Sequence, residues 1–290
     1  TRWAFLGLIF YLFNPALIFN SSVWGQADSF LAFLMTSSFY LLLEKQKIFL
    51  SALILGFAFL VKPQVLFILP VFAVFLFKKY KLRGFFKFSF VFLLTSLILS
   101  LPFFPGDPIF GLPNLIIQMG KDYPYTTLEA FNLWQFLGGR QNDSLLFLGL
   151  SKYHWGLLIY QINIAAQDPR ISLGKKSRKE NYYLAVALSL LNFFLFPTRI
   201  HERYLLPLFP FLLIAGSLLG SLTLIFSYFI MEILHFINIF YSYNYFYPKL
   251  IKIPIAKINN LPKMVSFLSI VLFFGLLIFY LRRFLKKNEV

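Results

Sequence analysis

The sequence contains no cysteine and few acidic residues. The absence of cysteine excludes disulfide bonds and thiolate chemistry. Charged residues are 13% of the 290 residues, whereas a soluble domain carries about 25%. The 11 acidic residues are outnumbered by 27 lysines and arginines, which gives a net charge of +16. Since the loops of membrane proteins are commonly basic and contact anionic lipid, we expect membrane lipids and not nucleic acid as partners.

Several common catalytic motifs are also missing. The chain has no GxxxxGK[ST], HExxH or GxSxG motif and no Cys/His spacing that would hold a metal. Their absence argues against the usual nucleotide, zinc-protease and serine-hydrolase sites. No metal and no cofactor are predicted.

The chain is rich in apolar and aromatic residues. Hydrophobic residues make up 59% of it, aromatic residues 21%, and there are 40 phenylalanines. Several apolar runs approach the roughly 20 residues that a helix needs to cross a bilayer. The predicted fold class is therefore all-α, a polytopic transmembrane bundle of about ten spans in a single domain, 1–290. The runs lie at about 3–20, 27–43, 48–61, 64–77, 85–104, 144–164, 181–197, 204–221, 222–241 and 264–281.

The loop charges predict an orientation. Basic segments at 44–47, 78–87, 166–180 and 282–287 all become cytoplasmic if the ten spans alternate, as the positive-inside rule requires. The basic, proline-containing segment 242–263 then falls outside and is read as an interfacial segment. If 204–241 held a single span, all later segments would lie on the opposite side of the membrane.

The segment 105–143 is predicted to be a long extracytoplasmic loop. Its prolines, glycines and aromatic residues are typical of interfacial or re-entrant segments. Its carboxylates show no pairing in the sequence and are expected to be solvated: Asp107, Asp122, Glu129 and Asp143. Asn132 and Trp134 are weaker candidates for substrate binding.

The strongest candidate site is the run 198–204, which has four ionisable residues between two apolar runs. On a helical turn Arg199 and Arg203 would share a face and could bind phosphate, with His201 as a further donor. Glu202 and Tyr204 would contact substrate. The alternative is interfacial snorkelling without a functional role.

A second candidate lies at the start of a predicted span. Trp24 could pack on a sugar ring, while Gln26 and Asp28 could hydrogen-bond sugar hydroxyls. A helix cap and an ordinary interfacial tryptophan are the alternatives. Lys62 and Gln64 flank Pro63 at the predicted tip of a hairpin, where Lys62 could contact the same phosphate or simply be a turn residue. We expect these residues to share one extracytoplasmic site.

Taken in order, the motifs resemble those of bacterial and archaeal GT-C glycosyltransferases, in the branch related to the GPI-anchor mannosyltransferases. The resemblance is carried by Asn14-Pro15, 22–28, Lys62-Pro63-Gln64, Asn132-Leu133-Trp134 and 201–207. It implies a multi-pass plasma-membrane enzyme that transfers a hexose, with mannose as the candidate, from a polyprenyl-phosphate donor. The acceptor would be a glycan, a lipid or a protein at the extracytoplasmic face.

The resemblance also implies a general base in an outer loop after a first span. Because the chain starts with Thr1 at the edge of a span, we expect it to be an N-terminally truncated fragment with this base upstream. The alternatives are a flippase or transporter of lipid-linked oligosaccharides and a non-catalytic membrane scaffold.

Overall fold

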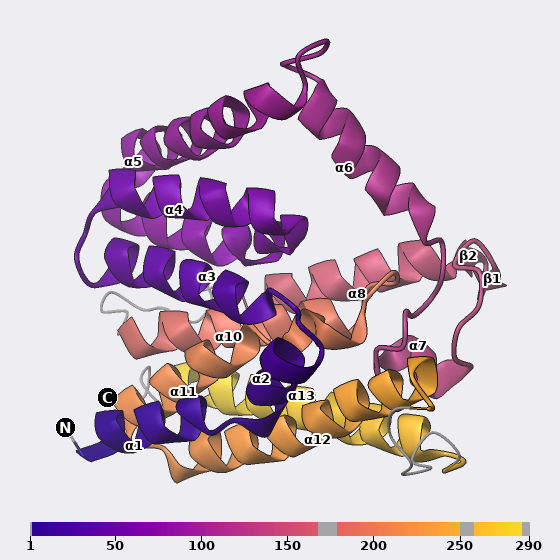
Figure 1. The fold of residues 1–290 in the computed structure, drawn as a ribbon. Helices are drawn as coiled ribbons and strands as arrows, with labels where there is room; N and C mark the ends of the chain where they lie inside the picture. Colours follow the sequence, from indigo (N-terminus) through magenta and orange to yellow (C-terminus); the bar gives the residue numbers. More distant parts are fainter. Residues whose placement is uncertain (1, 168–178, 250–257, 286–290) are drawn as a thin grey trace. The chain divides into compact units, whose positions relative to one another are not determined.

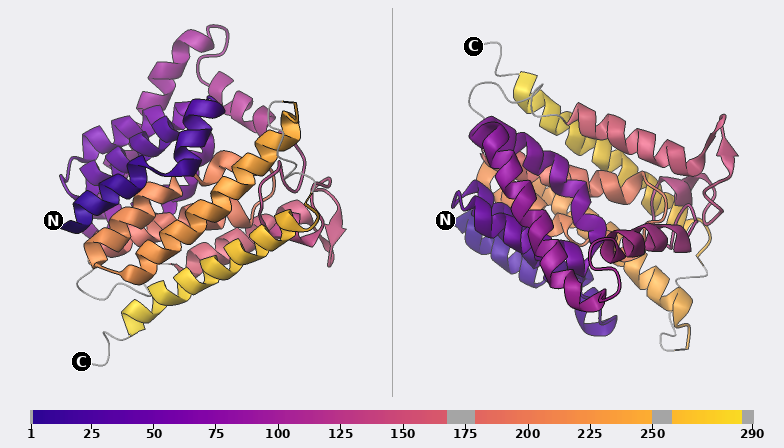
Figure 2. Two further views of the ribbon diagram at one scale, coloured as in Figure 1. Left: turned by 60° about the horizontal axis from the view of Figure 1, so that its bottom comes forward. Right: turned by 90° about the horizontal axis from the view of Figure 1, so that it is seen from above.

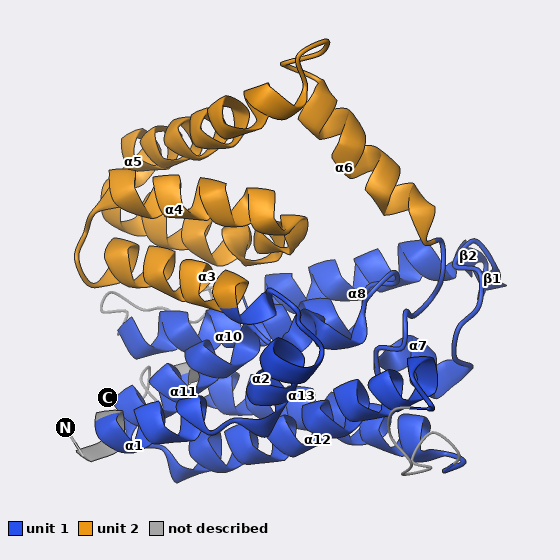
Figure 3. Ribbon diagram, viewed as in Figure 1, with its two compact units in different colours: residues 1–29, 124–290 blue, residues 30–123 orange. Residues whose placement is uncertain are grey.

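The computed structural model describes residues 2–167, 179–249 and 258–285 (Figure 1). Contacts divide it into two compact units, 1–29 with 124–290, and 30–123 (Figure 3). The larger unit contains α1 (Arg2–Leu12), α2 (Pro15–Ile18), α7 (Leu133–Leu137), α8 (Lys152–Ala166), α10 (Lys179–Leu195), α11 (Leu208–Leu219), α12 (Leu222–Phe246), α13 (Leu261–Leu285), and the hairpin of β1 (Leu146–Phe147) and β2 (Leu150–Ser151). The smaller unit holds most of α3 (Asp28–Leu43), then α4 (Ile48–Val61), α5 (Leu69–Ser100) and α6 (Gly111–Asp122).

The predicted helical membrane architecture is confirmed in outline. In the part of the chain that the structure describes, four helical stretches are long and apolar enough to cross a membrane, or five if α1 and the helices after it form one bent span. Two shorter apolar helices, α3 and α4, add to these. The number of about ten spans is not confirmed.

One of the four stretches, 63–103, reverses direction inside α5. Lys81 has φ 56° and ψ −160°, which is not a helical conformation. The rings of Phe72 and Phe88 lie 5.5 Å apart, and those of Phe77 and Phe85 stack at 4.4 Å. In a straight helix residues 72 and 88 would be about 24 Å apart, because each residue advances 1.5 Å. The stretch is therefore a helical hairpin, as the predicted break at 78–87 requires.

The core of the larger unit is built around α10. Every side chain from Asn181 to Leu195 is buried, and α10 packs against α8, α11 and α13. Figure 2 shows α12 and α13 running alongside each other, and their contacts confirm this packing. Two buried amides at this packing surface are paired: Asn163 donates to Asn192, which donates to the carbonyl of Tyr160. Such pairing is needed because an unpaired amide is costly in an apolar interior.

Some predicted helix boundaries are wrong. The run 3–20 is broken, because α1 ends at Leu12 and Asn14 caps α2 by accepting from the N–H of Leu17. The run 144–164 begins with the β-hairpin, and α8 starts only at Lys152. The loop 105–143 contains α6, whose residues are exposed or partly exposed, and the short α7. The segments 166–180 and 242–263 lie partly outside the described residues.

Gly156 in α8 supports the segment that leads into 198–204. A Cβ placed there would lie 2.8 Å from the carbonyl oxygen of Phe196 and 3.1 Å from the Cα of Pro197. Backbone atoms cannot move aside cheaply, so Gly156→Ala is expected to lower the free energy of unfolding by about 1–3 kcal/mol. Thermal unfolding in detergent measures the change. The control is Gly275→Ala in α13, where no atom lies within 4 Å of the added Cβ. Equal shifts in the two variants would contradict the packing argument.

Candidate functional site

Two segments far apart in the sequence meet within the larger unit. Asp28, at the first residue of α3, is fully buried, and its Oδ2 lies 3.9 Å from Nε of Arg203. Arg203 lies in the 3₁₀ turn Glu202–Leu205, directly before α11. Two of the residues singled out from the sequence, Asp28 and Arg203, thus lie next to each other, while the predicted shared binding site stays a prediction.

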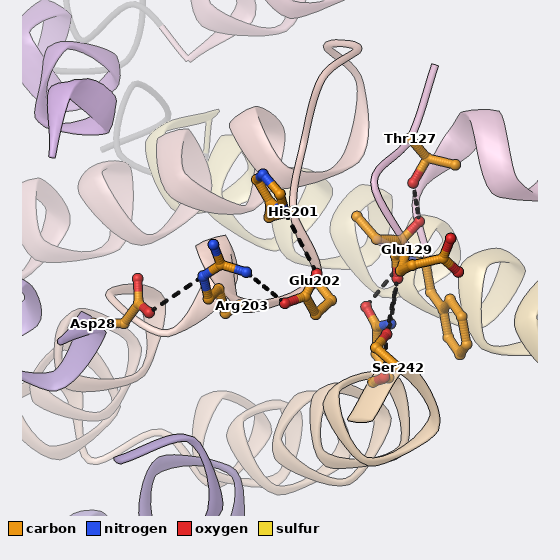
Figure 4. Close-up of polar contacts among 10 residues, drawn as sticks. Asp28, Thr127, Glu129, His201, Glu202, Arg203 and Ser242 are labelled. Carbon is orange, nitrogen blue, oxygen red and sulfur yellow. Dashed lines mark hydrogen bonds and ion pairs between the residues drawn. The ribbon is translucent and has the colours of Figure 1, made fainter. Parts of the chain in front are cut away.

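Arg203 lies between two carboxylates, and it is hydrogen-bonded to one of them (Figure 4). Its Nη1 donates to Oε1 of Glu202 at 2.7 Å, while Nε faces Asp28. Within the described ranges no hydrogen bond engages Nη2, and the side chain is 20% exposed. Both carboxylates are buried, and Arg203 is the cation that lies against each of them. The guanidinium still has one edge that could bind an anion.

Glu202 also orients His201. Its Oε2 lies 3.7 Å from Nδ1 of His201, so one buried carboxylate contacts both neighbours (Figure 4). The His201 ring packs edge-on against Tyr204 at 5.1 Å, and Tyr204 stacks on Phe193. These contacts place an imidazole and a guanidinium on either side of Glu202.

Residues 20–28 surround Asp28 with polar and aromatic groups. The buried Asn20 donates its Nδ2 to Asp28 Oδ2 at 3.4 Å. The N–H of Gln26 donates to the Asn20 carbonyl at 3.0 Å, which fixes the turn before α3. Trp24 is half-buried and packs edge-on against Tyr243 of α12 at 5.4 Å. The Trp24 ring thus has an aromatic neighbour, and its binding of sugar stays a prediction.

The predicted shared face of Arg199 and Arg203 is wrong. Arg199 has φ 65° and belongs to no helix. Its Nε and Nη2 donate to Asp143 at 2.7 and 3.2 Å, and its guanidinium lies over the Tyr153 ring at 4.6 Å. Asp143 is 1% exposed and also accepts from the hydroxyl of Thr198. The prediction that Asp143 is solvated is therefore wrong, and Arg199 fastens the loop 105–143 to the segment before the 3₁₀ turn.

Asn132 and Trp134 are buried and make internal contacts. Oδ1 of Asn132 caps α7 by accepting from the N–H groups of Trp134 and Gln135. The indole N–H of Trp134 donates to the Phe196 carbonyl at 2.7 Å. These groups hold the loop against the 196–204 segment, and their predicted contact with substrate stays untested.

Lys62 and Gln64 belong to the smaller unit. Lys62 has an extended backbone and ends α4, and Pro63 begins the 3₁₀ helix that leads into α5. Gln64 is 6% exposed, and neither polar atom of its side chain has a hydrogen-bond partner among the described residues. A buried amide without partners is unusual and marks Gln64 as a residue to test.

Glu129, which was expected to be solvated, is half-buried next to His201. Its backbone and that of Leu128 form bridges with His201, and Glu129 has φ 62°, which is rare for a residue with a side chain. No motif in the sequence marks it. In the described ranges, no group of three histidine or acidic side chains is placed to hold a metal ion.

Residues 1–137 match the model of glycosyltransferase family 87. A search of curated proteins gave no match. The matched residues, just under half of the chain, include Asp28 and the 124–132 loop that pairs with His201. With the apolar helices, this match supports a GT-C-like architecture, and the chain is a membrane glycosyltransferase.

Proposed function

We propose that the enzyme transfers a hexose, with mannose as the candidate, from a polyprenyl-phosphate donor to an acceptor at the extracytoplasmic face. The observation that carries the proposal is the environment of Arg203: its Nη1 donates to Glu202, its Nε lies 3.9 Å from Asp28, and its Nη2 has no hydrogen bond within the described ranges. A fixed guanidinium edge suits a phosphate monoester or diester, because two parallel N–H bonds match two phosphate oxygens.

His201 supports the same function. In a transfer reaction the bond between the sugar C1 and the phosphate oxygen breaks, and negative charge develops on the departing lipid phosphate. Donors that are already oriented stabilise that charge at little reorganisation cost. Arg203 and His201 are oriented by the shared Glu202 carboxylate and are proposed as these donors. Arg199 is assigned to the loop contact with Asp143, while Lys62 remains a candidate from the smaller unit.

The experiment is a donor comparison with the purified full chain in lipid nanodiscs. Polyprenyl-phosphate mannose, polyprenyl-phosphate glucose, GDP-mannose and UDP-glucose are each supplied with a membrane extract as the source of acceptor. We expect sugar incorporation and release of polyprenyl phosphate with a lipid-linked donor, and neither product with nucleotide sugars. Transfer from nucleotide sugars alone would contradict the proposal. Movement of the intact lipid-linked sugar across a vesicle membrane without transfer would favour a transporter.

A further inference from the structure

We propose that the helical hairpin of α5 binds an anionic phospholipid, with one acyl chain in an apolar groove between its two arms and the phosphate at the cations of its bend. The arms are residues 69–80 and 82–100, on either side of Lys81, and they lie within the smaller unit (Figure 3). The inference is independent of the proposed sugar transfer. Three observations carry it: the groove, the cations at one end of it, and the backbone conformation of Lys81.

The groove between the arms is almost entirely apolar. It has a volume of about 360 Å³ and is lined by ten side chains, of which only Ser89 is polar. Volumes of this size are typical of sites that hold a small molecule. A polar occupant would lose its hydrogen bonds to water and find almost none in their place, which is costly. The groove therefore suits a hydrocarbon chain.

The length of the groove fits one acyl chain. Its lining runs from Leu66 to Leu76 along the first arm, about 15 Å at a rise of 1.5 Å per residue. The hydrocarbon core of a bilayer is about 30 Å thick, so the chains of one leaflet extend over about 15 Å. Leu76 and Phe85 line the groove next to the bend. A chain that fills the groove would therefore meet its headgroup at the bend.

Exposed cations gather at this end of the groove. The cations of the bend are Lys78, Lys79, Lys81, Arg83 and Lys87, and all five are exposed. Glu44 is the one acidic residue in the sequence between 30 and 100. The ammonium of Lys79 lies 5.7 Å from the ring centre of Phe75 and 5.6 Å from that of Tyr80, so this charge is turned back toward the first arm. Basic sites beside membrane helices bind anionic headgroups.

The backbone of Lys81 is a further reason to assign a role to these charges. Its φ of 56° and ψ of −160° lie in a region that is essentially restricted to glycine. Glycine would adopt this conformation at lower cost, yet the residue is a lysine. Strained residues of this kind concentrate at sites that hold a ligand. An anionic headgroup at the bend gives the ammonium of Lys81 a ligand of opposite charge.

A phospholipid suits this site better than the polyprenyl-phosphate donor. The segment 78–87 is predicted to be cytoplasmic, whereas the donor phosphate is proposed to bind at the extracytoplasmic face. The isoprenoid chain of a polyprenyl phosphate is also longer than one leaflet, and the groove is not. The occupant is therefore a phospholipid of the cytoplasmic leaflet whose headgroup has a net negative charge.

The first test compares two lipids on the purified full chain in detergent. Phosphatidylglycerol and phosphatidylcholine with the same acyl chains are each added at increasing concentration. Native mass spectrometry measures the lipid that stays bound, and thermal unfolding measures the stabilisation. We expect phosphatidylglycerol to stay bound and to stabilise the protein at lower concentrations than phosphatidylcholine. Equal binding and equal stabilisation by the two lipids would overturn the proposal.

The double variant Lys81→Gln with Arg83→Gln tests the cations of the bend. One basic residue at an anionic lipid surface strengthens binding about fivefold, so we expect the apparent Kd for phosphatidylglycerol to rise roughly 30-fold. The Kd for phosphatidylcholine should stay unchanged. The charge-matched control is Lys121→Gln with Arg282→Gln, which removes two exposed cations outside the hairpin. Equal Kd values for phosphatidylglycerol in the two double variants would show that the bend is not the site.

Lys81→Gly separates the loss of charge from a loss of folding. Glycine suits the φ of 56°, so we expect the lipid-free protein to unfold at the same temperature as the parent or higher. Phosphatidylglycerol should bind about fivefold more weakly, because one ammonium is gone. A stable Lys81→Gly protein that binds phosphatidylglycerol as tightly as the parent would contradict the assignment of Lys81.

Ala73→Phe tests the groove itself. Ala73 lines the groove, and the added ring occupies space that the acyl chain would take. We expect phosphatidylglycerol to be lost, with the lipid-free protein as stable as the parent. The control Leu93→Phe places a ring on the exposed face of the second arm and should keep the lipid. Phosphatidylglycerol bound equally by both variants would overturn the proposal. So would an Ala73→Phe protein that loses polyprenyl phosphate but keeps phosphatidylglycerol, because the groove would then belong to the donor.

Discussion

Arg203→Ala is expected to lower sugar transfer from the lipid-linked donor by about 10²–10³-fold, the usual effect of losing one oriented donor to a developing negative charge. The substitution removes the guanidinium edge proposed to bind phosphate. It also leaves Asp28 and Glu202 buried without their shared cation, so that two negative charges face the incoming phosphate. The measurement is the initial rate of transfer at saturating acceptor, with donor binding measured separately by the thermal shift that polyprenyl phosphate produces.

Loss of the buried cation can also destabilise the protein, so the controls must separate stability from rate. The double variant Glu202→Gln with Arg203→Gln removes both charges of the 2.7 Å pair. We expect it to recover thermal stability relative to Arg203→Ala but not activity. Arg282→Ala, on an exposed arginine in the last turn of α13, should alter neither. Undiminished transfer by a folded Arg203→Ala protein would count decisively against phosphate binding at this side chain.

Asp143→Ala is expected to cause the largest loss of stability, about 3–5 kcal/mol in the free energy of unfolding, because it leaves a partner of a buried ion pair uncompensated. Asp143 is 1% exposed and receives three hydrogen bonds, from Thr198 and from two nitrogens of Arg199. Its own N–H donates to the carbonyl of Pro124, so it also closes the loop. Denaturation followed by tryptophan fluorescence measures the change.

The matched control for Asp143 is Asp107→Ala. Asp107 is exposed and accepts only local hydrogen bonds, from the N–H of Phe110 and the side chain of Asn114. Its loss should cost no more than a typical surface cap, about 0.5–2 kcal/mol. The double variant Asp143→Ala with Arg199→Ala should be more stable than Asp143→Ala alone, because it also removes the positive charge that Asp143 balanced. If Asp143→Ala and Asp107→Ala have equal effects, the ion pair does not fasten the loop.

Helices were predictable from the sequence where their signal is local. The ends of α4 match the prediction because Lys47 and Lys62 bound a continuous apolar run. The break in the first run was not predicted, since it depends on a tertiary contact. Asn14 donates to the hydroxyl of Tyr228, which donates to the carbonyl of Phe10. The break leaves the Phe10 carbonyl without a partner in its own helix, and only the folded structure shows that the Tyr228 hydroxyl takes that place.

The candidate site, too, was predictable only where the sequence carries a local signal. Ionisable residues beside apolar runs marked Asp28 and Arg203, and the structure places them in contact. The four-residue spacing of Arg199 and Arg203 predicted a shared helical face. This prediction was wrong because Arg199 adopts a left-handed backbone conformation and pairs with Asp143, which lies 56 residues away in the sequence. Glu129 carries no local signature, since hydrogen bonds from α12 hold its conformation.

The reversal of α5 at Lys81 gives the smaller unit an uneven distribution of charge along its long axis. Figure 3 shows the α3–α4 turn and the bend of α5 at the same end of this unit, so Lys45 and Lys47 gather there with the cations of 78–87. In a nascent membrane protein such polarity acts as a retention signal, because clustered cations resist translocation. If the unit 30–123 enters a bilayer, we therefore expect this end of it to stay on the cytoplasmic side.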